Sequence, residues 1–441
     1  MSSILTNTSA MVALQTLKSI NMDLGKTQSM ISTGKMVGSA KDNAAVWAIS
    51  KVMESDVAGF KAIQSSLNLG ESTVAVARQA SETVTDLLTQ LKDKIVASQE
   101  SNVDRAKIQT DIVALRDQIG SVVGAAQFNG LNLLSNQETT TAYTTAGSVE
   151  GSGEVSVLSS LDRSGAGVAA SNIDVAKQDL STQLADDDGA LVLAAAAMTA
   201  AGTATANGAA NATYTINGET TTAGRTSAVM AGDSYNFDMT IFDAAVAGTP
   251  FASAAAAKQD AIYVARDGDT TADVASGLVD MINFRLAEQG LSDDFTVTVG
   301  GANNNVVTVT NNTATAMAAS AAANIGLSAG GTVGGGLAIL SEIDVTTDNG
   351  ADAALTAIEG LLQTSIDSAA AFGSAQGRIE TQANFVSKLT DALRSGIGTL
   401  VDANMEEASA RLQALQVQQQ LGIQSLSIAN QAPQSILSLF R

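Results

Sequence analysis

Apolar residues recur at steps of three and four over most of the first 135 positions. Such spacing places each set on one face of an α-helix. Three sets follow one another along the chain: Ile49, Met53, Val57, Phe60, Ile63 and Leu67; Ala77, Ala80, Val84, Leu87, Leu91 and Ile95; Ile108, Ile112, Leu115 and Ile119. Leu17, Leu24 and Ile31 are spaced by seven, as in a coiled-coil seam. The pattern predicts amphipathic helices throughout this region.

Turn-forming residues separate these helices. Ser32-Thr33-Gly34 and Gly38-Ser39 interrupt the first helix, and Ser39 or Asp42 is expected to cap the second. Asn129-Gly130 follows the third helix and is a hairpin signal. We therefore predict a short β-hairpin there, with Asn129 and Gly130 in its turn.

The pattern changes near residues 138 and 340. Between them Thr, Ala, Gly, Ser, Asp and Asn dominate, and the segment ends in the Gly-rich stretch 330–336. Alternating residues predict strands at 213–218, 295–299 and 305–310. Helical spacing predicts a helix over 274–286. We call residues 139–340 the insert and expect it to be mixed α/β.

Helical spacing returns beyond residue 350 and continues to about residue 430. Its apolar sets are Leu355, Ile358, Leu362 and Ile366; Leu389, Leu393, Ile397 and Leu400; Ala408, Leu412 and Leu415. So long a helical run fits either a helical bundle within one chain or a coiled coil that other subunits complete.

Helices at both ends of the chain suggest that the ends pair and hold the insert at one end. Loop closure around the insert costs only a few kcal/mol, because that entropy grows with the logarithm of length. Burying Leu and Ile at ~1.5–3 kcal/mol each exceeds this cost. We expect a mainly α fold in which the terminal helices form a coiled coil and an elongated helical bundle, the stalk. The expected segments are two parts of an inner coiled-coil domain (1–40 and 401–441), two parts of the stalk (41–138, with the hairpin, and 341–400) and a variable, surface-exposed outer domain (139–340).

Composition excludes several classes of function. The formal net charge is -21 over 441 residues, which argues against nucleic acid as a partner. The chain has no Cys and no His, so disulfides, thiol nucleophiles and the commonest general base and metal ligand are missing. No run approaches the ~18 apolar residues that a membrane span needs. The sequence alone predicts neither membrane insertion nor a cleaved signal peptide.

The candidate chemical sites are weak. Residues 267–273 partly resemble a calcium loop but lack its sixth-position Gly and its twelfth-position Glu, where Leu278 stands. A solvated acidic turn is the favoured interpretation. Asp186-Asp187-Asp188 is expected to be an exposed charge run, and Trp47 to pack among helical apolar residues rather than to hold a ligand. We expect no enzyme, no cofactor, no catalytic site and no metal site.

Three motifs resemble those of the flagellin family. Residues 32–45 read STGKMVGSAKDNAA and resemble S-x-G-x-R-I-x-x-A-x-D-D-A-A. Residues 127–134 read QFNGLNLL and resemble the flagellin hairpin Q-F-N-G-x-x-L-L, and residues 430–441 resemble the family's N-Q-x-P-Q-x-x-L-x-L-x-R end. The motifs are jointly specific and cover the two ends but not the middle. Met36-Val37 and Asn43 depart from the family pattern, and together with Trp47 they resemble the alphaproteobacterial branch.

The resemblance implies a structural subunit that polymerises into the bacterial flagellar filament for motility. It implies an extracellular location, with type III export and no cleaved signal peptide. The implied partners are further copies of the chain, an export chaperone, a cap protein and a hook-junction protein. The extreme terminal helices would be disordered in the monomer and would fold on docking. The alternatives are a hook–filament junction protein, and a surface adhesin or glycan-binding module in residues 139–340.

These expectations assign roles to three groups of residues. The polymerisation interface is expected to contain Leu14, Leu17, Leu24, Leu426, Leu437 and Leu439. The stalk core is expected to contain Ile49, Val57, Leu67, Leu87, Leu115, Leu389 and Leu393. The hairpin turn is assigned to Asn129 and Gly130.

Overall fold

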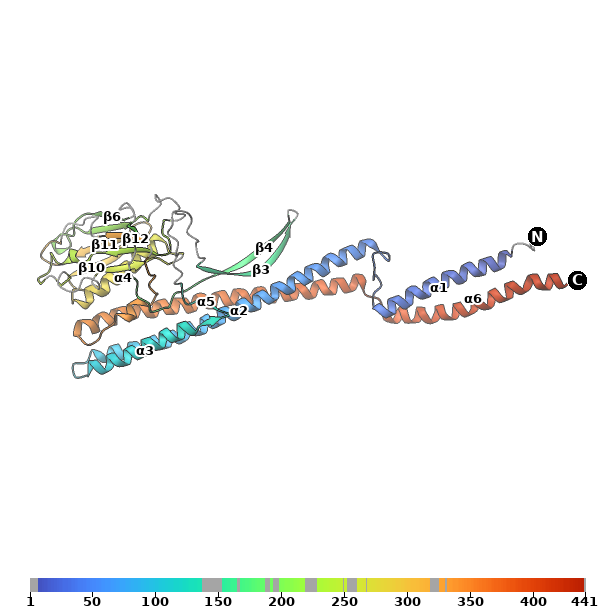
Figure 1. Ribbon diagram of the computed structural model, residues 1–441, viewed down its shortest axis with the longest axis horizontal. Helices are drawn as coiled ribbons and strands as arrows, with labels where there is room; N and C mark the ends of the chain where they lie inside the picture. Colours follow the sequence, from blue (N-terminus) through green and yellow to red (C-terminus); the bar gives the residue numbers. More distant parts are fainter. Residues whose placement is uncertain are drawn as a thin grey trace. The chain divides into compact units, whose positions relative to one another are not determined.

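The computed structural model describes residues 7–439 except 137–152, 165–166, 187–190, 193–197, 219–227, 249, 252–259, 267, 318–324 and 330. Long helices occupy both ends of the chain, and most strands lie in the middle (Figure 1). This confirms the mainly α fold with a mixed insert. The chain divides into two compact units. Unit 1 holds residues 1–65, 160–171 and 382–441, and unit 2 holds residues 66–159 and 172–381.

The first helix of unit 1, α1 (Thr8–Thr33), has a clear signal at each end. The Asn7 side chain accepts a hydrogen bond from the Ala10 N–H at 3.0 Å and so caps the start. Gly34 ends the helix with a φ of 69°, and its N–H donates to the Met30 carbonyl. The predicted break at Ser32-Thr33-Gly34 is confirmed. The last helix, α6 (Met405–Leu439), also belongs to this unit.

Two helices of more than fifty residues, α2 (Ala44–Ser98) and α5 (Asp348–Val401), each contribute to both units. The cap of α2 is Asn43, whose Oδ1 accepts a hydrogen bond from the Val46 N–H at 3.2 Å. Our prediction of Ser39 or Asp42 as this cap was wrong. The Asp42 carboxylate is instead occupied by the preceding turn, where it accepts hydrogen bonds from the Gly38 and Ser39 N–H groups.

Unit 2 contains a third helix, α3 (Arg105–Ala125), in addition to α2 and the first part of α5. Asp104 caps the start of α3. The sides of these helices that face one another are apolar, and fully buried residues include Leu67, Leu88, Leu91, Ile95, Ile112 and Phe372. A few polar contacts cross between helices. Thr85 and Ser365 are joined by a 2.9 Å hydrogen bond, and Arg78 Nε donates to Gln376 Oε1 at 2.9 Å. Such polar contacts fix the register of an otherwise apolar interface.

Two hairpins follow α3, the first in unit 2 and the second divided between the two units. The first is formed by β1 (Gln127–Phe128) and β2 (Leu131–Asn132), as predicted. The second is formed by β3 (Glu154–Ser164) and β4 (Gly167–Ala176). Val157 of β3 packs directly on Gly70 of α2, where a Cβ would lie 2.6 Å from a Val157 methyl group. The absence of a side chain at Gly70, in the middle of this long helix, therefore allows the second hairpin to pack against α2.

The rest of the insert contains two antiparallel four-stranded sheets (Figure 1). The first has the order β10-β11-β7-β6, and the second has the order β5-β12-β8-β9. Their strands are β6 (Met198–Ala201), β7 (Ala212–Ile216), β10 (Phe295–Gly300) and β11 (Val306–Asn311); and β5 (Leu191–Val192), β8 (Asp233–Phe237), β9 (Ala261–Val264) and β12 (Ile325–Ala329). The helix α4 (Thr271–Glu288) contacts both sheets. All three predicted strands and the predicted helix are therefore confirmed.

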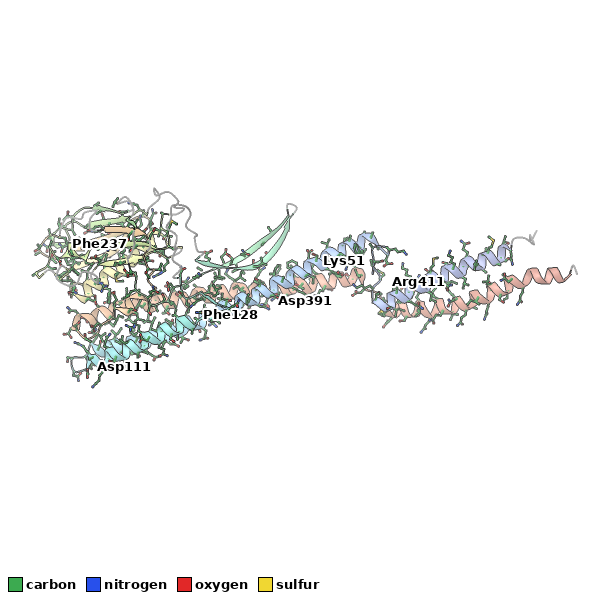
Figure 2. All side chains as sticks on the ribbon, viewed as in Figure 1. Lys51, Asp111, Phe128, Phe237, Asp391 and Arg411 are labelled. Carbon is green, nitrogen blue, oxygen red and sulfur yellow. The ribbon has the colours of Figure 1, made fainter. Side chains whose placement is uncertain are left out.

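An aromatic cluster forms the centre of the insert core. The ring centroids of Phe242 and Phe295 lie 4.7 Å apart with the ring planes at 63°, and those of Phe237 and Tyr214 lie 4.9 Å apart with the planes at 78°. All four side chains are at most 2% exposed. Figure 2 shows Phe237 inside the strand-rich part of the insert. Although aromatic residues make up 3% of the chain, they are concentrated where the two sheets and α4 meet.

We expect the insert to lose stability at alkaline pH through Tyr214. Burial, with a smaller contribution from Asp238, raises the pKa of this phenol from 10.0 to about 12. The pKa of Tyr214 is higher in the folded than in the unfolded chain, so the protonated phenol stabilises the folded insert fully below pH ~10. This contribution to the free energy of unfolding, up to about 2–3 kcal/mol, is lost as the pH rises from ~10 to ~12. In an alkaline titration followed by circular dichroism, Tyr214→Phe should unfold at a higher pH than wild type. Identical alkaline transitions would contradict the assignment.

Two extended segments flank the two sheets in the sequence, 179–186 after β4 and 331–337 before the short 3-10 helix Ala338–Ser341, and we call them the neck. They pair through backbone hydrogen bonds: Thr332 N–H donates to the Asp186 carbonyl at 2.8 Å, Gly335 to Gln183 at 2.8 Å, and Leu337 to Ser181 at 3.0 Å. The glycines permit this close approach, since a Cβ on Gly335 would lie 1.9 Å from the Ser181 carbonyl oxygen. The Gly-rich stretch is therefore a tightly packed ribbon.

Candidate functional site

The terminal helices α1 and α6 lie side by side in unit 1 (Figure 1). They run antiparallel, because Asn7 Nδ2 donates to the Ala429 carbonyl at 2.8 Å while Gln419 Nε2 donates to Asn21 Oδ1 at 2.7 Å. Between these two hydrogen bonds the helices approach closely at Gly422, where an added Cβ would lie 3.2 Å from the Leu17 side chain. Residues more than 390 positions apart in the sequence are thus brought into direct contact.

Much of the apolar surface of this helix pair is left uncovered. The large side chains that are more than half exposed are Met11, Val12, Leu14 and Met22 on α1, and Val417, Leu421, Ile423 and Ile428 on α6. They are 54–69% exposed. A groove of about 800 Å³ runs between the helices and is lined by residues including Val12, Thr16, Ile20 and Leu421. Large apolar side chains exposed in such number on one helix pair indicate a surface that binds another molecule.

The structure places the predicted interface residues on this helix pair. Leu14 is 57% exposed, whereas Leu17, Leu24 and Leu426 are half-buried. Leu437 and Leu439 belong to α6, but their side chains lie outside the described residues. Sequence reasoning overlooked Met11, Val12, Met22 and Val417, because it assigned only leucines to the interface. Counting every large apolar residue near the ends would have found them.

A charge-free segment coincides with the exposed side chains of α6. From Leu412 to Phe440 the sequence contains no Asp, Glu, Lys or Arg. The same is true of the first part of α1, from Thr8 to Leu17. The centres of protein–protein interfaces are depleted of charge, whereas ordinary solvated helix faces are rich in it. Charge and exposure therefore indicate the same surface.

The motif at residues 32–45 forms the connection between α1 and α2. Its backbone pairs with the segment between α5 and α6, where the Met36 N–H donates to the Val401 carbonyl at 2.7 Å and the Ala403 N–H donates to the Gly34 carbonyl at 2.9 Å. Hydrogen bonds from the Ser39 side chain and backbone lower the pKa of Asp42. The motif residues therefore stabilise a junction between segments from the two ends of the chain.

The predicted stalk-core residues have mixed exposures. Val57, Leu67 and Leu87 are buried, and Leu115, Leu389 and Leu393 are half-buried. Ile49 is 54% exposed, so it is not a core residue of the single chain. The inward face of α2 passes through Ser50 instead, which is 2% exposed and lies seven positions before Val57. Successive steps of four drift by about 40° around a helix with 3.6 residues per turn, which moves Ile49 off the face.

The predicted hairpin turn adopts the conformation that its sequence requires. Asn129 and Gly130 have φ angles of 51° and 81°, and Phe128 pairs with Leu131 across the turn. Two successive positive φ angles are typical of a type I′ turn, which suits the twist of a tight hairpin.

Replacing Gly130 by Ala is expected to lower the free energy of unfolding by about 1–2 kcal/mol, because a residue with a Cβ is strained in the left-handed region. No atom lies within 4 Å of the added Cβ, so the effect would come from the backbone alone. Gly124→Ala on α3 is the matched control, since its Cβ also meets nothing and its φ is ordinary. Urea unfolding of both variants measures the difference, and equal midpoints would contradict the prediction.

The acidic turn around residue 269 is engaged in local structure. Asp269 accepts hydrogen bonds from the Tyr263 hydroxyl at 2.6 Å and the Arg266 N–H at 2.8 Å, and Asp273 forms the capping box of α4 with Thr270. Asp267 lies outside the described residues. Within the described ranges, no group of three carboxylates is arranged to hold a metal ion. None of the described helices is both long and apolar enough to cross a bilayer.

Known proteins match this chain at both ends and over its full length. Residues 4–139 match the bacterial flagellin N-terminal helical region, and residues 355–440 match the bacterial flagellin C-terminal helical region. The chain is 37% identical to Flagellin A of Rhizobium meliloti strain 1021 and 35% identical to a second Flagellin A of Rhizobium meliloti, covering 100% of all the chains compared. The solved FliC structure from Burkholderia pseudomallei aligns with 70% of this chain and 99% of its own, at 16% identity and a TM-score of 0.30.

The full-length relatives decide the family, whereas the structural alignment is too weak to carry an argument. The full-length relatives confirm the resemblance seen in the three terminal motifs, including its alphaproteobacterial branch. The chain belongs to the bacterial flagellin family.

Proposed function

We propose that this protein is a structural subunit that polymerises into the bacterial flagellar filament for motility. The observation that carries the proposal is the uncovered, charge-free apolar surface of the paired helices α1 and α6. Seven large apolar side chains in the charge-free segments are more than half exposed, and Met22 lies beyond Lys18 on α1. Burying each of them against neighbouring copies would contribute ~1.5–3 kcal/mol before ordering costs.

The polymerisation interface would include the predicted Leu14, Leu17, Leu24 and Leu426, with Leu437 and Leu439 at the end of α6. The exposed neighbours Val12, Leu421 and Ile428 extend it. Two antiparallel helices alone bury little of this surface. Isolated helices are marginal in water, so full ordering of the terminal segments would accompany docking. The inner coiled-coil domain at 1–40 and 401–441 would thus be completed by other subunits.

The remaining roles follow from the family and are part of the proposal. The assembled protein would be extracellular, exported without a cleaved signal peptide, and non-enzymatic. An export chaperone, a cap protein and a hook-junction protein would be its partners besides copies of itself. The stalk segments 41–138 and 341–400 would position the outer domain at 139–340.

The glycan-binding alternative gains no support from the aromatic side chains. Sugar sites commonly use exposed aromatic rings, but among the described aromatic residues of the insert all except the half-buried Tyr263 are buried, and the Tyr263 hydroxyl donates a hydrogen bond to Asp269. The named full-length relatives favour a filament flagellin over a junction protein.

Electron microscopy of the purified chain at high concentration, with filament seeds added, tests the proposal. We expect long helical filaments that pellet on ultracentrifugation. A protein that stays monomeric under these conditions, while circular dichroism shows it to be folded, would refute the proposed function.

A further inference from the structure

Four methionines of unit 1 present their thioethers to solvent. Met11 and Met22 lie on α1, Met36 lies in the connection between α1 and α2, and Met405 is the first residue of α6. They are 43–63% exposed. Met36 stands at the motif position where flagellins usually carry Arg, so this thioether is a feature of this particular chain.

The other methionines whose side chains the structure describes are buried or half-buried. Met230, Met239 and Met317 of the insert are at most 6% exposed. Met53 of α2 is half-buried and packs against α5, where a Cβ on Gly396 would lie 3.1 Å from its terminal methyl group. A dissolved oxidant therefore meets the exposed thioethers of unit 1 before those of the insert.

The composition of the chain directs an oxidant to these thioethers. The chain has no Cys, so no thiol competes with them for peroxide. In the reaction with hydrogen peroxide, a sulfur lone pair bonds to one peroxide oxygen as the O–O bond breaks. The proton of the transferred oxygen passes to the leaving hydroxide, which departs as water. The sulfur is oxidised by two electrons to a sulfoxide, and the peroxide is reduced.

A sulfoxide changes the surface that assembly is proposed to bury. Met11 lies in the charge-free segment 8–17, next to the exposed residues Val12 and Leu14. A thioether is apolar, whereas a sulfoxide oxygen is polar and needs a hydrogen-bond donor. Burying this oxygen without a partner is expected to weaken association roughly tenfold or more at each site.

We propose that Met11, Met22, Met36 and Met405 are oxidation sites through which hydrogen peroxide controls assembly, a proposal that rests on the proposed function. In the free subunit the four thioethers are open to peroxide, and their sulfoxides prevent polymerisation. In the filament, neighbouring subunits would cover them, so a filament that has already formed resists the same oxidant. Oxidation therefore stops growth and leaves existing filaments intact.

Peroxide treatment of free subunits tests this control of assembly. Wild-type monomer is incubated with dilute hydrogen peroxide until peptide mass spectrometry detects sulfoxide at the four sites. The peroxide is then removed, and pelleting with filament seeds measures the critical concentration. We expect it to rise roughly tenfold or more, with an unchanged circular dichroism spectrum. Methionine sulfoxide reductases should restore both the thioethers and assembly. Filaments treated in the same way should stay intact and unmodified at these sites.

Leucine substitutions identify the residues responsible, because Leu replaces Met with little change in volume. The fourfold variant should assemble and should no longer respond to peroxide; it carries Met11→Leu, Met22→Leu, Met36→Leu and Met405→Leu. The matched control carries Met30→Leu and Met281→Leu, at two half-buried positions, and should stay as sensitive as wild type.

Several outcomes would overturn the proposal and leave the proposed function standing. They are normal assembly of oxidised wild type, peroxide sensitivity retained by the fourfold variant or lost by the control, and sulfoxides that form in filaments as fast as in monomers. If the untreated fourfold variant does not assemble, the reductase experiment decides, and assembly that stays lost after the thioethers are restored overturns the proposal. Failure of untreated wild type to form filaments would instead overturn the proposed function, and this proposal with it.

Discussion

Removal of residues 421–441 is expected to abolish polymerisation while leaving a soluble, folded monomer. The deletion removes Leu421, Ile423, Leu426, Ile428, Ile436, Leu437, Leu439 and Phe440. Burying half of these in the filament would contribute about 6–12 kcal/mol per subunit before ordering costs. A loss of that size raises the critical concentration by several powers of ten. Pelleting after mixing with seeds measures it.

The matched control removes the strand-rich part of the insert instead. The neck brings the Ser181 carbonyl within 3.0 Å of the Leu337 N–H, so a short Gly/Ser linker can replace residues 182–336 without straining the helices. This variant retains the β3–β4 hairpin, which packs on Gly70 of α2. It should polymerise into thinner filaments. If the C-terminal deletion pellets like wild type, or the insert deletion never pellets, terminal-helix assembly is wrong.

Replacing Gly335 by Ala is expected to destabilise the insert by about 2–5 kcal/mol, combining steric strain with weakened neck hydrogen bonds. The added Cβ would lie 1.9 Å from the Ser181 carbonyl oxygen and 2.4 Å from its carbonyl carbon. Because these are backbone atoms, no side-chain rotation relieves the clash. The two neck segments must separate, and the hydrogen bond from Gly335 to Gln183 is lost or lengthened.

Gly360→Ala on α5 is the control for this substitution. Nothing lies within 4 Å of its Cβ, and alanine favours a helix over glycine by about 1 kcal/mol, so stability should rise slightly. Thermal unfolding of both variants, with limited proteolysis to report separation of the neck, measures the two effects. Gly335→Ala melting at or above the Gly360→Ala temperature would show that the neck is not closely packed.

Local patterns predicted the long helices, the first hairpin and three strands and the helix of the insert, but they missed the β3–β4 hairpin and the strands β5, β6, β8, β9 and β12. The helices and the strands around residues 213–218, 295–299 and 305–310 followed from spacing, because period 3.6 and period 2 each place one face in a core. The Asn129-Gly130 turn followed from its need for positive φ, which is a property of two adjacent residues. The terminal motifs similarly sufficed for the family. The assignment of individual interface leucines stays a prediction, because it concerns contacts between copies.

The sequence by itself determined where the long helices, three strands of the insert and the tight turn form, and that the terminal segments are apolar and uncharged, since these are properties of neighbouring residues. Only the tertiary structure decided how distant segments meet. It set the antiparallel register that joins Asn7 to Ala429, turned the inward face of α2 through Ser50 rather than Ile49, and occupied Asp42 in a turn so that Asn43 became the cap. It also made the Gly-rich stretch a closely packed ribbon. Each of these outcomes depends on which surfaces compete for burial and hydrogen bonds in three dimensions, and no local pattern encodes that competition.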